Sequence, residues 1–212
     1  MVVEGGRILG VGSGLDGDEA VDASGCAVLP GMFDCHVHVV VSTIDLLVDL
    51  QQPFSYQFFA AARNLERTLD RGITTVRDAG GADLGVKQAA VRKAREVVET
   101  HRDSFRRAVA AGVKVAMGTD SGVTAHGENL RELGLMADGG MKPEDVLAAT
   151  TSSAAELLGV DGELGTIEPG KRADLVLVDG DPFDLASLPG AVREVWKDGA
   201  RVRPWQRHLA SA

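Results

Sequence analysis

Residues 29–38 read Leu29-Pro30-Gly31-Met32-Phe33-Asp34-Cys35-His36-Val37-His38, a turn followed by an apolar strand that ends in two histidines. On a β-strand, residues two positions apart point to the same face. His36 and His38 are therefore presented side by side, while Val37 faces the opposite way into packing. Two imidazoles held on one strand face supply half of a metal site, so this stretch predicts metal chemistry at a strand end.

The composition is typical of a soluble globular protein, with 44% hydrophobic and 25% charged residues. A length of 212 residues allows one domain, or one domain with a smaller appendage. The net charge of −9 argues against nucleic-acid binding, which needs a basic face. The most apolar run, residues 37–50, is interrupted by polar side chains and is too short to span a membrane.

Cys26 and Cys35 are the only cysteines, too few for a disulfide scaffold. Two reduced thiols are favoured over a bridge or a cysteine metal ligand. Residues 1–12 show neither a charged region with an apolar core nor a small-residue cleavage site, so no secretory signal is expected. These features predict a cytoplasmic protein.

Both ends of the chain are rich in strand signals. Residues 2–9 predict a hairpin around Gly5-Gly6, and residues 26–29 predict a short strand before the Pro-Gly turn. Near the C-terminus, residues 173–179 predict an apolar strand, and residues 192–197 meet residues 200–202 across Asp198-Gly199. The two ends are therefore expected to form one small sheet layer together.

The middle of the chain alternates helices with apolar strands, the pattern of a parallel α/β sheet. Helices are predicted over 56–71, 84–111, 129–137 and 143–158, and strands over 73–77 and 113–117. The first helix is expected to bury the face that carries Phe58, Ala62, Leu65 and Leu69. The second has an apolar stripe that includes His101, which is expected to be a packing residue.

Asp120 lies where the strand 113–117 runs out into a loop, as the two histidines do at their own strand. In parallel α/β folds, reactive groups collect at the carboxyl ends of the strands. Alone, Asp120 would be a helix cap or a loop residue. Together with His36 and His38 it suits a hydrolytic metal site, in which the carboxylate takes a proton from a metal-activated water and returns it to the leaving group.

Two further residues near these strand ends have open interpretations. His126, in the loop after Asp120, is either a solvated histidine or a substrate contact or extra ligand. Asp78, which follows the strand 73–77, either caps the next turn or touches substrate.

Several segments, in order along the chain, resemble the amidohydrolase superfamily of metal-dependent hydrolases. They are residues 29–38, 72–80, 118–122 with 126–130, 148–158 and 165–176. The similarity is greatest to the branch around imidazolonepropionase and the Xaa-Pro dipeptidase-like or acyl-amino-acid hydrolases. The resemblance implies a (β/α)₈ TIM-type barrel flanked by a small β-sandwich. It also implies that His36 and His38 are first-strand metal ligands and that Asp120 is the last-strand ligand and proton shuttle.

The chain is too short for that whole barrel, which needs about 250 residues. The segment at Asp78, which resembles the family's second strand, is followed after one helix by the segment at Asp120. Nothing between them resembles the carboxylated lysine and the two histidines that the family draws from mid-barrel. Lys87 and Lys93 fall in the helical pattern, and Lys114 lies at the wrong end of its strand.

The expected fold is therefore α/β, an incomplete amidohydrolase barrel with strands equivalent to 1, 2 and 8. The barrel is expected over residues 31–159. Its middle strands are missing, and the point where the remaining parts join is expected between residues 87 and 95. A partial, composite β-sandwich is expected over 1–30 and 160–212, with part of the family's N-terminal strands missing. Open sheet edges predict edge-to-edge assembly into a homo-oligomer.

In a closed barrel the first and last strands are neighbours, so His36, His38 and Asp120 are still expected to meet. They suffice for one divalent ion, most simply zinc, although iron or manganese would also suit them. The family itself uses a binuclear site. The chain is thus predicted to be a metal-dependent amidohydrolase that cleaves a carbon–nitrogen bond in a small amide, cyclic amide or dipeptide-like molecule. An inactive remnant with partial metal binding, and an incomplete product of a longer gene, are the alternatives.

Overall fold

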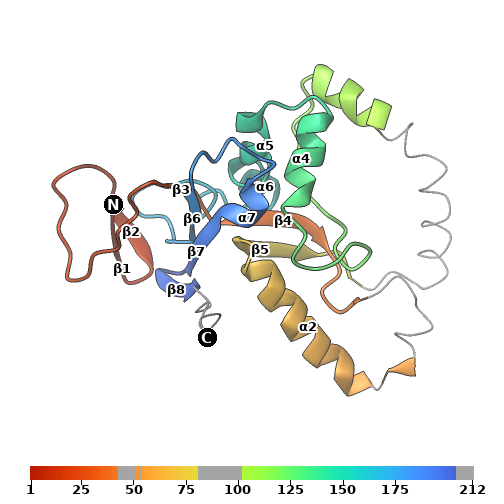
Figure 1. Cartoon of the computed structure of the whole chain (residues 1–212), viewed down its shortest axis with the longest axis horizontal. Coiled ribbons are helices and arrows are strands. Elements are labelled where there is room, and N and C mark those ends of the chain that lie inside the picture. The colour runs from red at the N-terminus through yellow and green to blue at the C-terminus, as the bar shows by residue number, and fades with distance from the viewer. Residues whose placement is uncertain (43–50, 53, 81–101, 204–212) are drawn as a thin grey trace, which may run out of the picture.

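The computed structural model describes residues 1–42, 51, 52, 54–80 and 102–203, which form a mixed α/β fold (Figure 1). There are three sheets in this part of the chain. β1 (Val2–Glu4) and β2 (Arg7–Gly10) form a hairpin, four further strands form an antiparallel sheet, and two strands pair in parallel. The parallel strands among these residues do not close into a barrel.

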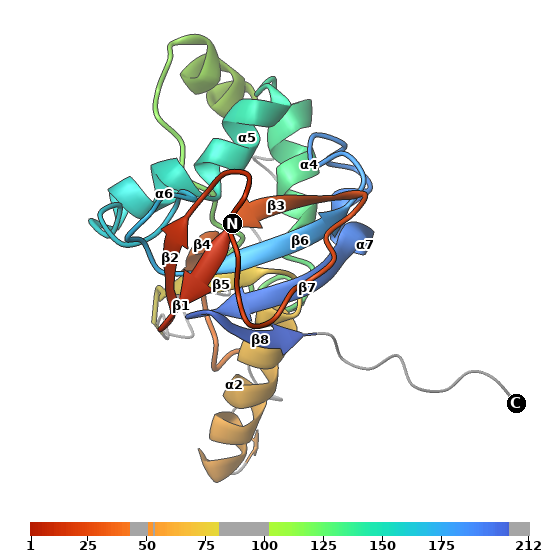
Figure 2. The same ribbon diagram turned by 90° about the vertical axis from the view of Figure 1, so that its left-hand side faces the viewer.

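The antiparallel sheet joins the two ends of the chain (Figure 2). Its order is β3-β6-β7-β8, with β3 (Cys26–Pro30), β6 (Leu175–Asp179), β7 (Val192–Lys197) and β8 (Ala200–Arg203). Asp198 and Gly199, between β7 and β8, have φ of 50° and 74°, the left-handed pair of a type I′ turn. The predicted end strands are confirmed, and β3 shares its sheet with the C-terminal strands, but the N-terminal hairpin forms a separate two-stranded sheet. The division into domains stays a prediction.

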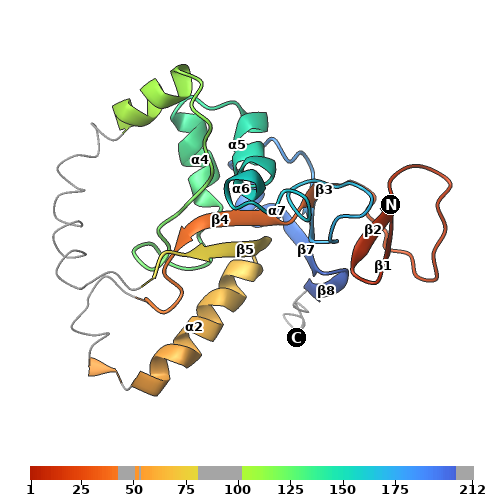
Figure 3. The same cartoon turned by 180° about the vertical axis from the view of Figure 1, so that it is seen from behind.

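The parallel pair is β4 (Met32–Val37) and β5 (Ile73–Asp78), connected through α2 (Phe54–Leu69). Residues 117–121 run along the opposite edge of β4. The Cys35 N–H donates to the Met117 carbonyl at 2.8 Å, and the Asp120 N–H donates to the His36 carbonyl at 2.8 Å. β4 is therefore central, and the ends of all three segments gather at one side of the molecule (Figure 3).

Residues 113–117 are not a regular strand, contrary to the sequence-based prediction. The Met117 N–H donates to the Ala149 carbonyl at 2.9 Å, and the Phe33 N–H donates to the Thr150 carbonyl at 2.7 Å. These two N–H groups, which a β-ladder would pair with a strand, instead donate to carbonyls at the end of the helix over residues 143–149. The segment follows β4 without forming a ladder of its own.

The helix predicted over 143–158 is two helices, α5 (Pro143–Ala149) and α6 (Ser152–Leu157). At the break, the Thr150 hydroxyl donates to the Phe33 carbonyl at 2.8 Å. Thr151 has φ of −130° and ψ of −95°, outside helical geometry. Bonds from Thr150 to β4 therefore end the helix that its sequence pattern would continue.

Helices lie on both sides of the parallel strands, with α4 (Arg131–Asp138), α5 and α6 on one side and α2 on the other (Figure 1). Residues 102–110 are helical, the described part of the helix predicted over 84–111. The rest of that prediction, with His101, Lys87, Lys93 and the join, lies outside the described residues. No helix that the structure describes is both long enough and apolar enough to cross a bilayer.

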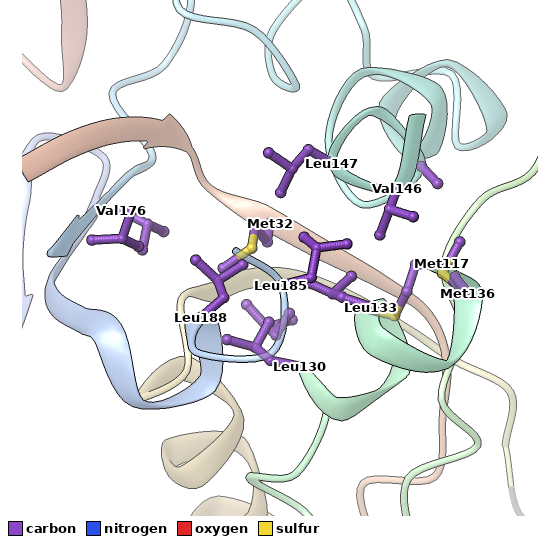
Figure 4. Packing of buried hydrophobic residues seen from close by; sticks show 13 residues of the cluster. Met32, Met117, Leu130, Leu133, Met136, Val146, Leu147, Val176, Leu185 and Leu188 are labelled. Atoms are coloured by element: carbon purple, nitrogen blue, oxygen red, sulfur yellow. The ribbon is translucent and has the colours of Figure 1, made fainter. Parts of the chain in front are cut away.

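The main core lies between the strands and α4, α5 and α7 (Leu188–Ala191) (Figure 4). Met32 of β4 and Val176 of β6 contribute to it together with Leu133 of α4, so one core spans the antiparallel sheet and the parallel strands. The removal of a side chain such as that of Leu133, which is fully buried, would cost about 2–5 kcal/mol of stability.

The buried face of α2 differs from the prediction. Phe58 and Leu65, expected inside, are 60% and 42% exposed, whereas Asn64 and Thr68 are buried. The Asn64 side-chain amide donates to the Val39 carbonyl at 3.0 Å and lies near the Ser42 hydroxyl at 3.1 Å. The amide of Asn64 thereby pairs backbone groups of the loop after β4, so the inward face of α2 includes a polar contact that apolar periodicity does not predict.

Candidate metal centre

His36 lies near the carboxyl end of β4, and His38 directly follows the last residue of that strand. Their rings lie 5.3 Å apart between centroids, at an interplanar angle of 73°. Val37 between them is 1% exposed, as the alternation of a strand requires. The His38 side chain is 10% exposed and that of His36 is 48% exposed, so the pair lies at the boundary between core and solvent.

Asp120 completes a three-residue cluster. Its Oδ1 atom lies 3.0 Å from His38 Nε2 and 3.5 Å from His36 Nε2. One ligand atom from each of the three residues lies within 4.8 Å of the other two. Asp120 has φ of 54°, a left-handed conformation that is uncommon outside glycine but tolerated by aspartate. The structure therefore brings together the three residues that the sequence singled out.

The orientation of His38 is fixed from the end of β5. Its Nδ1 atom donates to the Gly80 carbonyl, because a carbonyl oxygen can only accept. With Nδ1 engaged by this carbonyl, Nε2, which lies 3.0 Å from Asp120 Oδ1, is the ring nitrogen placed to bind an ion. Metal-binding histidines are commonly held in this way by a partner at the other ring nitrogen.

Asp78 shapes the turn that presents the Gly80 carbonyl. Its Oδ1 atom accepts from the Gly80 N–H at 2.6 Å. The capping role is therefore observed for Asp78, one of its two sequence-based interpretations. Gly80 is not among the predicted site residues, because it contributes a backbone carbonyl and no side chain.

These donors fit a divalent ion. Two imidazole Nε2 atoms and one carboxylate form a set found in catalytic zinc sites, and such a set leaves a coordination position open. The Asp120 side chain is 53% exposed, so the cluster is accessible from solvent. The Gly80 carbonyl holds His38 through Nδ1, and Asp120 Oδ1 lies 3.0 and 3.5 Å from the two Nε2 atoms. These contacts support metal binding more strongly than the residue types alone.

His126 lies beneath the loop that follows β4. It is 8% exposed, and its Nε2–H donates to the carbonyls of His38 at 3.2 Å and Val41 at 3.1 Å. Burial lowers the pKa of His126, and the two carbonyls oppose that shift in part. Its predicted contact with substrate stays a prediction, but the observed bonds support the backbone beside His38.

The two cysteines are free thiols, as expected. Cys35 is buried on β4, and burial raises the pKa of its thiol. Lys114 is exposed and paired with Glu156, so it takes no part in the cluster.

Comparison with known proteins places these features in context. The sequence profile described as the amidohydrolase family matches residues 84–205, a stretch that includes Asp120. Imidazolonepropionase from Caldanaerobacter subterraneus is 35% identical over 127 residues, 58% of this chain and 29% of that protein. Ochratoxinase from Aspergillus niger is 29% identical over 131 residues, 57% of this chain and 27% of that protein.

Among solved structures, a Xaa-Pro dipeptidase with methionine bound in its active site is similar in fold. The TM-score is 0.75 at 19% identity, and the match covers 95% of this chain and 94% of that one. This likeness concerns the fold alone. The chain spans less than a third of the length of the two curated relatives above.

Proposed function

Because the chain belongs to the amidohydrolase family, we propose that it is a metal-dependent hydrolase of carbon–nitrogen bonds in a small amide, cyclic amide or dipeptide-like molecule. The observation that supports this most is the convergence of His36, His38 and Asp120 at the ends of neighbouring strands. Imidazolonepropionase and ochratoxinase are among the similar proteins, which favours this class of bond.

The three residues would hold one divalent ion, and zinc suits two imidazoles and a carboxylate. When bound, such an ion supplies Lewis-acid activation of water and of the substrate carbonyl. His36 and His38 bind and orient through Nε2, and the Gly80 carbonyl keeps His38 in the required tautomer. Asp120 accepts the proton of the attacking water on its carboxylate and returns it to the leaving nitrogen.

A second candidate is an inactive relative that retains the metal and has lost hydrolysis. It is favoured by the short span against the curated relatives and by the open arrangement of the parallel strands among the described residues. In such a relative the three ligands would be kept, while residues that shape the substrate pocket would be lost. The two free thiols fit a reducing compartment, so a cytoplasmic location is part of the proposal.

Metal analysis tests the site first. Purified protein dialysed against zinc should retain about one ion per chain by mass spectrometry, and His36→Ala and His38→Ala should each lose it. Asp161→Asn, a change at an exposed carboxylate outside the cluster, is the control and should retain the ion. Metal-free wild-type protein after this treatment would refute the proposal.

Hydrolysis then separates the two candidates. The zinc-loaded protein is assayed against acyl-amino acids, dipeptides and cyclic amides, with Asp120→Asn as the matched variant. Turnover that falls by at least about 100-fold in Asp120→Asn supports the enzyme, in line with the size of general acid–base effects. Hydrolysis no faster than the uncatalysed background in both proteins, with the ion bound, favours the inactive relative.

A further inference from the structure

Asp34 is a completely buried carboxylate on β4, two residues before His36. Its Oδ1 atom accepts from the His36 N–H at 3.2 Å and from the Thr119 N–H at 3.0 Å. Its Oδ2 atom accepts from the Thr119 hydroxyl at 2.5 Å and from the Asn129 side-chain amide at 2.7 Å. A carboxylate offers about four lone-pair positions, and each oxygen here receives two donors.

The backbone donors to Asp34 come from β4, through His36, and from the segment that carries Asp120. Thr119 directly precedes Asp120, and its hydroxyl also accepts from the Ser121 N–H at 3.1 Å. The Ser121 hydroxyl lies 2.6 Å from that of Thr119 and accepts from Asn129 at 3.0 Å. Both neighbours of Asp120 are therefore anchored through one buried network.

This anchoring matters because Asp120 has an unfavourable backbone conformation. A left-handed non-glycine residue persists where its surroundings impose it. The Ser121 carbonyl also accepts from the His38 N–H at 2.7 Å, so the loop is tied to β4 on both sides of the aspartate. The network thereby sets the direction in which the Asp120 carboxylate leaves the backbone.

We propose that Asp34 is a positioning residue that places the Asp120 carboxylate against His38 through Thr119, Ser121 and Asn129. The proposal rests on the metal site proposed above and adds to it the residue that assembles its third ligand. Asp34 is not proposed as a ligand, because protein donors already occupy both of its oxygens.

An asparagine at position 34 has the same shape but the wrong hydrogen-bonding pattern. Its NH₂ group would face the Asn129 side-chain amide, which at that contact is a donor. Thr119 can adapt, because a hydroxyl accepts as well as donates. In the double variant D34N/N129D the pair is reversed, so the new amide donates to the new carboxylate.

The experiment measures cobalt binding by the visible absorption of the ion, which reports both affinity and coordination geometry, beside the melting temperature. The variants are D34N, D34N/N129D and Thr119→Val, a milder change that removes one hydroxyl of the network. The control is D174N. Asp174 is also buried, at 3% exposed, and its carboxylate accepts from Lys197 and from the Asp198 N–H at 2.9 Å, outside the cluster.

D34N is expected to bind cobalt about 10- to 100-fold more weakly with an altered spectrum, the usual size of such effects. Thr119→Val should weaken binding less, and D34N/N129D should recover most of the affinity. D174N should lower the melting temperature and leave the spectrum unchanged. Wild-type affinity and spectrum in D34N, or an equal loss in D174N, would overturn the proposal.

A wild-type protein that takes up no cobalt would instead count against the proposed function. Crystal structures of wild type and D34N then test the positioning directly. Asp120 is expected within hydrogen-bond distance of His38 in the wild type and displaced in D34N. An Asp120 that stays in place in D34N overturns the inference whatever the metal does.

Discussion

A substitution at Gly118 tests how closely the segment that carries Asp120 must approach β4. A Cβ atom added at Gly118 would lie 2.9 Å from His36 Cβ and 3.3 Å from the His36 nitrogen. Carbon atoms in favourable contact are about 3.5–4.0 Å apart. In Gly118→Ala the two segments must therefore separate by roughly 0.6 Å or more, because neither contact atom can rotate away.

That displacement exceeds what the cluster tolerates. Metal–ligand distances in well-formed sites lie within about 0.2 Å of their standard values, and Asp120 is only two residues beyond Gly118. The Asp120 N–H to His36 carbonyl bond and the 3.0 Å approach to His38 should both lengthen. We expect cobalt or zinc affinity to fall by at least about 10-fold, equivalent to about 1.4 kcal/mol.

Isothermal titration with zinc measures the change. Gly134→Ala in α4 is the matched control, because a Cβ there meets nothing within 4 Å. That variant should bind zinc normally and gain about 0.5–1 kcal/mol of stability from its helical position. The reasoning fails if Gly118→Ala binds zinc as tightly as the wild type does.

Three further outcomes follow from contacts outside the cluster. Burial raises the pKa of Cys35 above 9.0, so its contribution to the free energy of unfolding is complete below pH 9.0 and is lost as pH rises through the raised value. Urea titrations of wild type and Cys35→Ala should diverge there, and parallel curves would contradict the assignment. Thr150→Val removes the bond to Phe33 and should cost about 1 kcal/mol in urea unfolding; no loss would mean that the bond does not help to end α5. Phe59, 73% exposed on α2, should tolerate Phe59→Gln within about 0.5 kcal/mol, while light scattering checks whether self-association falls; a larger loss of stability would show that this face is covered.

Local sequence signals identified the regular elements well where geometry depends on neighbours along the chain. Turn chemistry predicts the Asp198-Gly199 hairpin, and the alternation of side chains predicts the strand that carries His36 and ends just before His38. The approach of Asp120 was also anticipated, from the rule that reactive groups gather at the carboxyl ends of parallel strands and from the resemblance to a barrel in which first and last strands adjoin.

Predictions failed where the partner of a polar group lies far away in sequence. The face of α2 was assigned from its apolar residues, yet Asn64 points inward because the loop after β4 has carbonyls to satisfy. The break at Thr150 was missed because its partner, the Phe33 carbonyl, lies on β4. Periodicity counts apolar positions and does not register such bonds.

The sequence by itself determined the chemistry available at this site, two histidines on one strand face and an aspartate at the end of another segment. Only the tertiary structure decided the orientation of these three side chains. The Gly80 carbonyl selects the tautomer of His38, and the buried carboxylate of Asp34 fixes the loop around Asp120. The physical reason is that ligand types are properties of residues, whereas orientation depends on hydrogen-bond partners that meet only when the chain folds.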